Sequence, residues 1–242
     1  MSVLSIEHIN AGYGDFQALF DISLDIVKGE LLALVGANGA GKSTLMRSIA
    51  GEIRPMNGRV MFDGQDVTTL PATQRSRLGI GLVPEGRRLF PSLTVEENLL
   101  VGTATKRSGP WDLAAVYELL PLVQDRRKRR AAGLSGGEQQ AVAIGRALMG
   151  NPTLLLLDEV SLGLAPIVIE QLYDALPRIR AEGMTMLLVE QDLTRTLKVA
   201  EDIACILEGR VVLQGAAGSF TREQVTNAYF GTGYGSTEEV TA

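Results

Sequence analysis

The sequence predicts an α/β fold in which a mostly parallel β-sheet is covered by helices. Three continuous apolar runs, at residues 31–35, 153–157 and 184–189, are typical of strands that are buried on both faces. Helical patterns at residues 166–181 and 192–200 alternate with the last of these runs. Because strands that alternate with helices pair in parallel, this order favours a parallel sheet at the centre of the fold.

The first third of the chain contains shorter strands of a different kind. Residues 4–7 and 22–26 alternate apolar and polar side chains, which is typical of strands with one buried face. Residues 60–62 are a further expected strand, and Asp63-Gly64 is the turn that follows it. In the sequence, two of these strands precede the first buried run and one follows it.

The middle of the chain, from about Thr94 to Met149, has a mainly helical pattern and no convincing strand. We therefore expect a helical insertion into the α/β core. Near the end, residues 203–207 and 210–213 flank the turn sequence Glu208-Gly209, and this arrangement predicts a β-hairpin.

Composition limits the function before any motif is considered. The 242 residues are 45% hydrophobic and 21% charged, which is typical of a globular protein. A net charge of −5 disfavours nucleic acid as a partner, and a single cysteine excludes an internal disulfide and fits a reducing compartment. No apolar run approaches the roughly 18 residues of a membrane span, and the N-terminus has no secretory signal pattern.

The turn after the first buried run matches the phosphate-binding P-loop pattern G-x-x-x-x-G-K-[ST]. A helical pattern over residues 42–50 follows it and ends at Gly51, so the motif has the strand and the helix it needs. We expect Lys42 to reach the β- and γ-phosphates of a nucleotide and Ser43 to bind Mg²⁺. The expected nucleotide-binding residues of this loop are Gly36, Ala37, Asn38, Gly39, Ala40, Gly41, Lys42, Ser43 and Thr44.

A second acidic element of the kind that a P-loop requires follows the apolar run at 154–157. Asp158 is expected to hold Mg²⁺, directly or through water. Glu159 comes next and would orient the attacking water or accept its proton. An ordinary strand end with two solvated acids is the alternative, and the P-loop in the same chain argues against it.

The segment 134–140, Leu-Ser-Gly-Gly-Glu-Gln-Gln, is more selective than either motif. It resembles the LSGGQ signature of the ATP-binding-cassette (ABC) ATPases, with Glu138 where glutamine is usual. The resemblance implies that Ser135, Gly136, Gly137 and Glu138 contact the ATP bound to a partner subunit in a head-to-tail dimer. The same residues also match a helix N-cap of the Ser-x-x-Glu type, and the two roles are compatible.

The resemblance covers about residues 3–230 and assigns further roles. Tyr13 stands where the family stacks an aromatic ring on adenine; a tyrosine without that role is the alternative. Glu85 stands at the Q-loop, which contacts Mg²⁺ and the membrane partner, although glutamine is usual there. Residues 161–164 fall at the D-loop, which crosses the dimer seam. Gln191 replaces the usual switch histidine, and His8 is expected to be structural or on the surface.

Segments 83–91, 134–140, 189–191 and 228–231 look like one subgroup of this family, the LivF-type ATPases of branched-chain amino acid importers. This resemblance implies MgATP hydrolysis on the cytoplasmic face of a bacterial inner membrane. It implies a second ATPase subunit as partner, either a LivG-like sibling or a copy of itself. It also implies two permease subunits and, indirectly, a periplasmic binding protein.

Other interpretations remain at this point. The cargo is another amino acid, an amide or a small organic acid in related importers, and a non-transport ABC ATPase acting on nucleic acid or the ribosome is the more distant rival. A third interpretation is a module that binds ATP without hydrolysing it. Glu159 argues against it, because this residue is placed to act on the attacking water. The basic run 126–130 is interpreted as a solvated helix end. The apolar segment 89–93 either docks a membrane subunit or packs within the insertion.

The motifs and the resemblance together give the domain organisation. One nucleotide-binding domain spans residues 1–242, with a P-loop NTPase core and an N-terminal antiparallel β-subdomain over about 1–85 and 151–230. A helical subdomain with the signature motif spans about 86–150. Residues 231–242 are small and polar, and we expect a frayed tail there.

Overall fold

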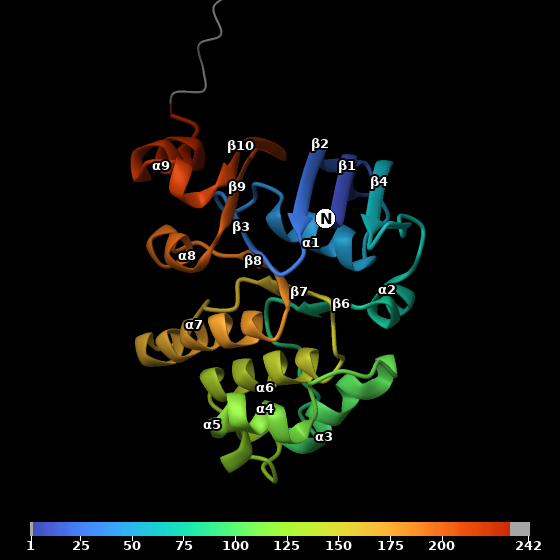
Figure 1. Ribbon diagram of the computed structural model, residues 1–242, viewed down its shortest axis with the longest axis vertical. Helices are drawn as coiled ribbons and strands as arrows, with labels where there is room; N and C mark the ends of the chain where they lie inside the picture. The colour runs from blue at the N-terminus through green and yellow to red at the C-terminus, as the bar shows by residue number, and fades with distance from the viewer. Residues whose placement is uncertain (1, 233–242) are drawn as a thin grey trace, which may run out of the picture.

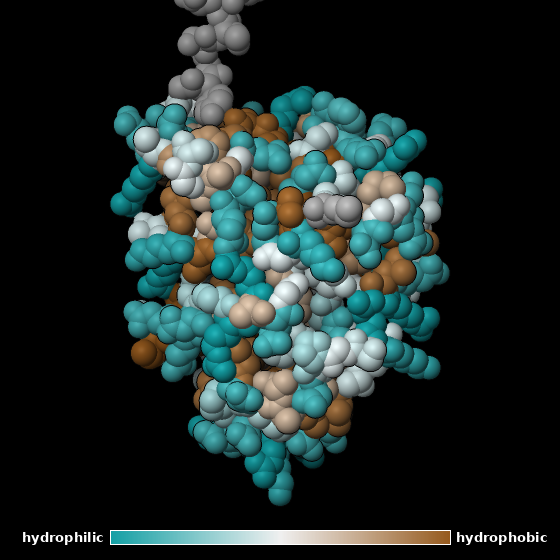
Figure 2. Space-filling view, in the orientation of Figure 1, coloured by the Kyte–Doolittle hydropathy of each residue, from teal (hydrophilic) through white to brown (hydrophobic). Residues whose placement is uncertain are grey.

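The computed structural model describes residues 2–232 and contains two β-sheets and a group of helices (Figure 1). The expected frayed tail lies outside the described residues except for Gly231 and Thr232. Gly231 adopts a left-handed conformation and ends the last helix. None of the helices described is long and apolar enough to cross a membrane. Figure 2 shows a face on which hydrophilic residues dominate and apolar ones form small groups.

The first sheet is antiparallel and has the strand order β2-β1-β4-β5. Its strands are β1 (Ser2–Tyr13), β2 (Phe16–Val27), β4 (Asn57–Phe62) and β5 (Gln65–Asp66). The expected alternation is confirmed in β2, where Ile22, Leu24 and Ile26 are all buried. One face of this sheet therefore packs against the rest of the protein, and the other faces solvent.

The second sheet has the order β10-β9-β3-β8-β7-β6 and is parallel except for its last hairpin, β9–β10. All residues of β3, β7 and β8 are buried, as the continuous apolar runs predicted. The mostly parallel core is thus confirmed. The six strands are β3 (Leu31–Val35), β6 (Ile80–Val83), β7 (Leu154–Asp158), β8 (Thr185–Val189), β9 (Asp202–Leu207) and β10 (Arg210–Ala216).

Helices cover both faces of this sheet, and α3 to α6 gather at the end of the molecule away from the antiparallel sheet (Figure 1). The helices of the core are α1 (Lys42–Ala50), α2 (Ala72–Leu78), α7 (Pro166–Ala181), α8 (Leu193–Val199) and α9 (Arg222–Phe230). Those of the middle segment are α3 (Val95–Val101), α4 (Leu113–Leu119), α5 (Pro121–Asp125) and α6 (Gly136–Leu148), and the short 3₁₀ turns are η1 (Gly102–Thr105), η2 (Ala131–Gly133) and η3 (Ala217–Ser219). The helical middle is thus as expected.

The core divides along the strands of the parallel sheet. In β7, Leu154 and Leu156 face the cluster that contains α1 and the antiparallel sheet. Leu155 and Leu157 face the cluster that contains α3, α4, α6 and α7. Successive side chains of a strand point to opposite faces, so a run of leucines is what two apolar faces require.

Several elements, among them β6, α2 and α9, were not predicted from the sequence. The strand β6 has only four residues, and the helix α2 carries five polar side chains and has no apolar stripe. The helix α9 buries only Val225 and Ala228, so its amphipathic pattern is weak. These elements are formed by contacts with the rest of the fold rather than by local patterning.

Arg75 of α2 is 1% exposed and ties three segments together. Its Nη1 donates to the carbonyl oxygens of Ser48 and Ile49, at 2.7 and 2.8 Å, which lie at the C-terminal end of α1. Its Nε and Nη2 donate to Leu70 and Thr68. Burial lowers the pKa of Arg75 to about 10, and Asp66 opposes this effect. The guanidinium therefore satisfies carbonyls that the end of a helix leaves unpaired.

We expect Arg75→Ala to lower the free energy of unfolding by about 3 kcal/mol, because it removes four hydrogen bonds to carbonyl oxygens, two of them buried. Denaturant unfolding measures this change. Arg77→Ala, at an exposed position of the same helix, is the matched control and should change the free energy by under about 0.5 kcal/mol. Equal effects of the two substitutions would show that the buried contacts of Arg75 contribute nothing special.

Candidate functional site

The expected phosphate loop lies between the carboxyl end of β3 and the start of α1. Gly36 and Gly41 have φ values of 152° and 109°, which side chains of L-residues rarely allow. A Cβ atom on Gly36 would also clash with the carbonyl oxygen of Ile206 in β9. At the start of α1 no side chain caps the helix, so its first N–H groups are free to bind an anion.

Lys42 lies across this loop, and the residue is 4% exposed. Its Nζ donates to the carbonyl oxygens of Gly36 and Ala37, at 2.8 and 3.0 Å. The same atom is 3.8 Å from Oε1 of Glu159. Burial lowers the pKa of Lys42, whereas the carboxylates of Glu159 and Asp158 oppose the shift. The side chain is therefore a buried cation between the loop and the end of β7.

The two acids at the end of β7 face different neighbours. Asp158 is 3% exposed, and its Oδ1 accepts a hydrogen bond from Oγ of Ser43 at 3.2 Å. Burial is the largest cause of the raised pKa of Asp158, and the charges of Glu159 and Glu85 add to it. Oε2 of Glu159 accepts from Nε2 of Gln191 at 2.9 Å. The fold thus places Ser43, Asp158, Glu159 and Gln191 together.

The oxygen atoms of this group suit a hard divalent cation. No group of three or more histidine, cysteine, aspartate or glutamate residues that could hold a metal occurs within residues 2–232. A magnesium ion needs no such group, because it is usually bound by one or two carboxylates, water and the phosphates of its nucleotide. The paired oxygens of Ser43 and Asp158 fit that pattern.

Two more residues from the sequence analysis lie near the edge of this site. Tyr13 is 47% exposed at the tip of the β1–β2 hairpin, and its hydroxyl accepts from Nη1 of Arg47 in α1 at 3.3 Å. Glu85 is exposed in the turn after β6, and its charge contributes to the raised pKa of Asp158. His8 is exposed and pairs with Asp21 at 2.7 Å, away from this group.

The signature segment starts α6 in the helical part of the protein (Figure 1). Ser135 and Glu138 form a capping box, which confirms the expected N-cap. Both carboxylate oxygens of Glu138 are occupied: Oε2 accepts from the Ser135 N–H at 2.7 Å and Oε1 from Nε of Arg126 at 2.6 Å. No hydrogen bond within the described residues joins Ser135 or Glu138 to the phosphate loop.

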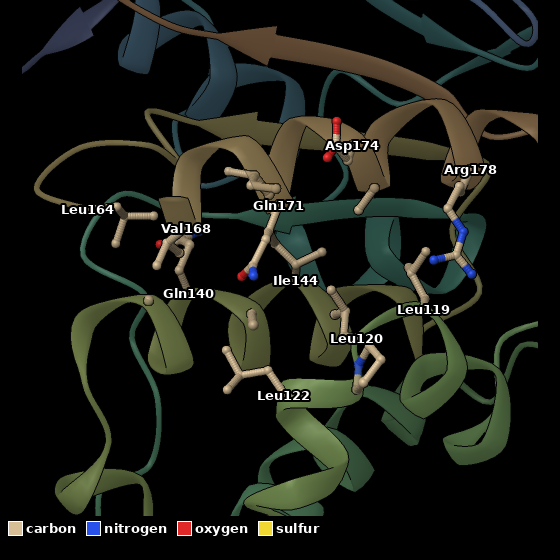
Figure 3. Close-up of a pocket in the computed structure, with 15 residues that line it drawn as sticks. Leu119, Leu120, Leu122, Gln140, Ile144, Leu164, Val168, Gln171, Asp174 and Arg178 are labelled. Carbon is tan, nitrogen blue, oxygen red and sulfur yellow. The ribbon is translucent and has the colours of Figure 1, made fainter. Parts of the chain in front are cut away.

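The signature helix packs on α7 beside an apolar groove of about 340 Å³ (Figure 3). A Cβ atom on Gly137 would lie 2.7 Å from Cγ1 of Val168, so the absence of a side chain allows the close approach. Figure 3 shows Ile144 of α6, Gln171 of α7 and Leu122 of α5 around this groove. The contact joins the helical layer to the core.

Two residues at the site were not predicted to have a role. Glu190 follows β8, is 2% exposed, and accepts two hydrogen bonds from Ser161. Arg87 has a positive φ of 65°, and its Nη1 donates to Gln139 of α6 at 3.4 Å. A signal for Glu190 exists, because an acid directly after a buried parallel strand lies at the edge where the other motifs meet. Nothing in the sequence indicates the contact of Arg87.

Comparison with known proteins gives consistent matches. The model of the ABC transporter family matches residues 19–161. The branched-chain amino acid transport ATP-binding protein BraG of Pseudomonas aeruginosa is 44% identical over 232 residues, which cover 95% of this chain and 100% of BraG. A probable LivF protein of Archaeoglobus fulgidus is 38% identical and covers 86% of this chain and 90% of its own length.

Solved structures agree with these matches. The ADP conformation of an ATP-binding cassette from an ABC transporter superposes with a TM-score of 0.79 and 27% identity, covering 98% of this chain and 100% of that one. A dimeric cassette in a post-hydrolysis state, bound to ADP and phosphate, has a TM-score of 0.79 and 25% identity, covering 88% and 98%. The expected ABC ATPase fold is thereby confirmed.

We expect the Ser135–Glu138 cap to stabilise the protein in a pH-dependent way. The backbone hydrogen bond from Ser135, and then the Arg126 contact, hold the pKa of Glu138 below its ordinary value of 4.5. A lowered pKa in the folded state stabilises the fold above the ordinary value, and this stabilisation is lost as the pH falls through the folded-state pKa.

Glu138→Gln should therefore unfold at lower denaturant concentration than wild type at pH 7, and the difference should shrink when the pH falls below about 4.5. Urea titrations at several pH values measure it. Glu7→Gln, at an exposed position of β1, is the control and should unfold at the same denaturant concentration as wild type at pH 7. A difference that stays constant from pH 7 to pH 3 would contradict the ionised cap.

Proposed function

Because the chain belongs to the ABC transporter family, we propose that it is the ATP-hydrolysing subunit of an importer for branched-chain amino acids. The observation that carries the cargo is the 44% identity with BraG over that protein's whole length. Two family members named for sulfate/thiosulfate import are 40% and 36% identical over 63% and 92% of their length, and one named for spermidine/putrescine import is 37% identical over 55%. The higher identity with BraG, over its whole length, therefore favours the branched-chain class over these cargoes.

The phosphate loop would bind the nucleotide through backbone and side-chain donors. The uncapped N–H groups of α1 and of the loop from Gly36 to Gly41 suit the phosphate oxygens. Lys42 now donates to two loop carbonyls, and it would pair with the β- and γ-phosphates instead. Thr44 follows Ser43 in the first turn of α1, and the exposed ring of Tyr13 would stack on adenine.

Ser43 and Asp158 would hold Mg²⁺, and Glu85 would contribute a weaker contact from the turn after β6. When bound, Mg²⁺ neutralises charge on the phosphate oxygens. Asp158 is buried beside Lys42 and Ser43, so its carboxylate is already oriented toward the loop. The chain thus supplies hard oxygen donors where the nucleotide's phosphates would lie.

Glu159 is the candidate general base. Its carboxylate lies between Lys42 and Gln191, at 3.8 and 2.9 Å, and it would orient the attacking water or accept its proton. Gln191 would sense the γ-phosphate as a hydrogen-bond donor, because its amide donates and does not titrate near neutral pH. One amide N–H already fixes the carboxylate, and the second remains for a phosphate oxygen.

A second subunit would complete the site. Ser135, Gly136 and Gly137 would face the nucleotide on the partner's phosphate loop, and the dimeric structure of a related cassette supports this assembly. The oxygens of Glu138 are already taken by Ser135 and Arg126, so the contact would come from the Ser135 hydroxyl and the glycine N–H groups. The partner is a LivG-like sibling or a second copy of this chain.

The permease would dock in a groove of about 480 Å³ between the core and the helical layer. Leu82 and Pro84 line it on one side and Val101 and Ala104 on the other, next to Glu85. Leu82 and Pro84 are half-buried and Val101 and Ala104 are exposed, and apolar side chains at such a groove suit a helix of a membrane partner. The segment 89–93 is divided, because Leu89 packs in the core while Phe90 is 48% exposed.

This assembly would place the chain on the cytoplasmic side of the inner membrane as a peripheral subunit, with a periplasmic binding protein on the other side. An importer for another amino acid, an amide or a small organic acid is the second candidate. Action on nucleic acid has less support, since the net charge is −5 and the first arginine of the basic run is paired with Glu138.

Lys42→Ala should abolish import and ATP turnover, because the γ-phosphate loses its charge partner. Uptake of radiolabelled leucine, isoleucine and valine, in cells whose own subunit is deleted, measures this effect. Wild type should restore uptake, and Glu7→Gln, at an exposed position of β1, should restore it equally. If wild type restored uptake of a different solute but not of these amino acids, the assigned cargo would be wrong. Normal ATP turnover by Lys42→Ala would show that the nucleotide site is wrongly assigned.

Glu159→Gln should bind ATP, lose hydrolysis by at least about 100-fold and accumulate as a dimer, because a missing base leaves the closed ATP-bound state intact. Light scattering with MgATP measures the mass, alone and with a sibling ATPase. Wild type without nucleotide is the reference. A mutant that binds ATP and stays monomeric in both mixtures would contradict the head-to-tail dimer.

A further inference from the structure

We infer that Glu190 is a positioning residue whose buried carboxylate fixes the loop after Glu159 through Ser161 and so aligns the Glu159–Gln191 pair. This inference rests on the proposed function, because it assigns that pair to ATP hydrolysis. The side-chain carboxylate of Glu190 is hydrogen-bonded to Ser161 in the loop 159–164.

The contact between Glu190 and Ser161 is short and double. Oε1 of Glu190 accepts from the Ser161 N–H at 3.0 Å, and Oε2 accepts from Oγ of Ser161 at 2.7 Å. A carboxylate can only accept, so both Ser161 groups are fixed as donors and the serine has one orientation. The residue is 2% exposed, so water does not compete for these bonds.

Two neighbouring contacts join the same two segments. The Glu159 N–H donates to the carbonyl oxygen of Val189 at 3.0 Å, and Nε2 of Gln191 donates to Oε2 of Glu159 at 2.9 Å. Glu159 is thus hydrogen-bonded to residues 189 and 191, and Ser161 is hydrogen-bonded to residue 190. Glu159 has a φ of 47°, a conformation that is unfavourable for a side-chain-bearing residue and that these bonds stabilise.

The charge of Glu190 has no cationic partner within the described residues. Its nearby charge is the carboxylate of Glu159, which repels it. Burying such a group costs free energy that hydrogen bonds only partly offset. Burying a neutral side chain at this position would cost less free energy than burying a carboxylate. We therefore take the carboxylate, which can only accept hydrogen bonds, as a sign that the loop must keep one orientation.

The orientation of this loop affects both its exposed middle and the carboxylate of Glu159 at its start. Leu162 is 51% exposed and Gly163 has a φ of 69°, so the middle of the loop faces solvent, where the proposed dimer seam would form. Glu159 begins the loop and accepts a hydrogen bond from Gln191, which follows β8. Glu190 therefore joins the seam to the reacting pair, and losing it should lower kcat while leaving nucleotide affinity nearly unchanged.

The test uses Glu190→Ala, Glu190→Gln, Ser161→Ala and the double variant Glu190→Ala/Ser161→Ala in the full chain. Glu182→Ala, at an exposed acidic position after α7, is the control. Residue-resolved amide hydrogen exchange of nucleotide-free protein reports the Ser161 N–H. ATP turnover gives kcat and KM, and a fluorescent ADP analogue gives nucleotide affinity.

We expect Glu190→Ala to lose Ser161 protection and to lower kcat roughly tenfold, with ADP affinity within about twofold. Glu190→Gln keeps one acceptor, so it should retain protection and recover part of kcat. The double variant should be no slower than Glu190→Ala, because both changes act through one contact. Glu182→Ala should match wild type.

Unchanged Ser161 protection in Glu190→Ala, multiplying effects in the double variant, or an unchanged kcat would overturn the inference. If Glu190→Ala does not fold, Glu190→Gln and Ser161→Ala decide it by the same exchange and kcat measurements. If the wild-type protein had no ATP turnover, the proposed function would be wrong. The exchange of the Ser161 N–H would still test its contact with Glu190, because it is measured without nucleotide.

Discussion

The parallel register of β3, β8 and β7 determines where the site forms. Leu34 and Asp158 both pair with Val189, so the three strands end at nearly the same level. The residues that follow them are therefore side by side: the phosphate loop, the acids and the pair Glu190–Gln191. A shift of one residue in either pairing would turn Asp158 or Glu190 toward the opposite face. The chemistry of the site thus depends on backbone hydrogen bonding in the sheet.

Burial gives this edge its electrostatic character. Lys42, Asp158 and Glu190 are each under 5% exposed, and each is hydrogen-bonded, Lys42 to loop carbonyls, Asp158 to Ser43 and Glu190 to Ser161. Burial lowers the pKa of the lysine and raises the pKa of the two acids, so all three are moved toward their neutral forms. An anionic nucleotide with a divalent cation would supply charges that oppose these shifts.

The sequence was sufficient where a local pattern determines structure. The helix α1 begins after Gly41 and ends before Gly51, and both glycines have left-handed backbone conformations. The strand β7 is identified by its leucines, which point to both faces of the sheet. The Ser135 cap was predictable from four residues. By contrast, α9 and β6 lack a pattern of their own, and the contacts of Glu190 and Arg87 join positions 29 and 52 residues apart. Such contacts depend on the register of the whole sheet, which no local pattern encodes.

The substitution of glutamate at position 138 has a structural explanation in the basic run that the sequence left without a role. A carboxylate in the first turn of α6 interacts favourably with the helix dipole and completes the cap. Its second oxygen still needs a hydrogen-bond donor. Arg126, the first residue of the run, supplies it at 2.6 Å. The backbone carbonyls of Arg127 and Arg129 accept from Glu96 and Val95 at the start of α3, which fixes the run against the helical layer. The arginine and the glutamate therefore act together: the signature helix begins with a neutralised carboxylate and an exposed serine.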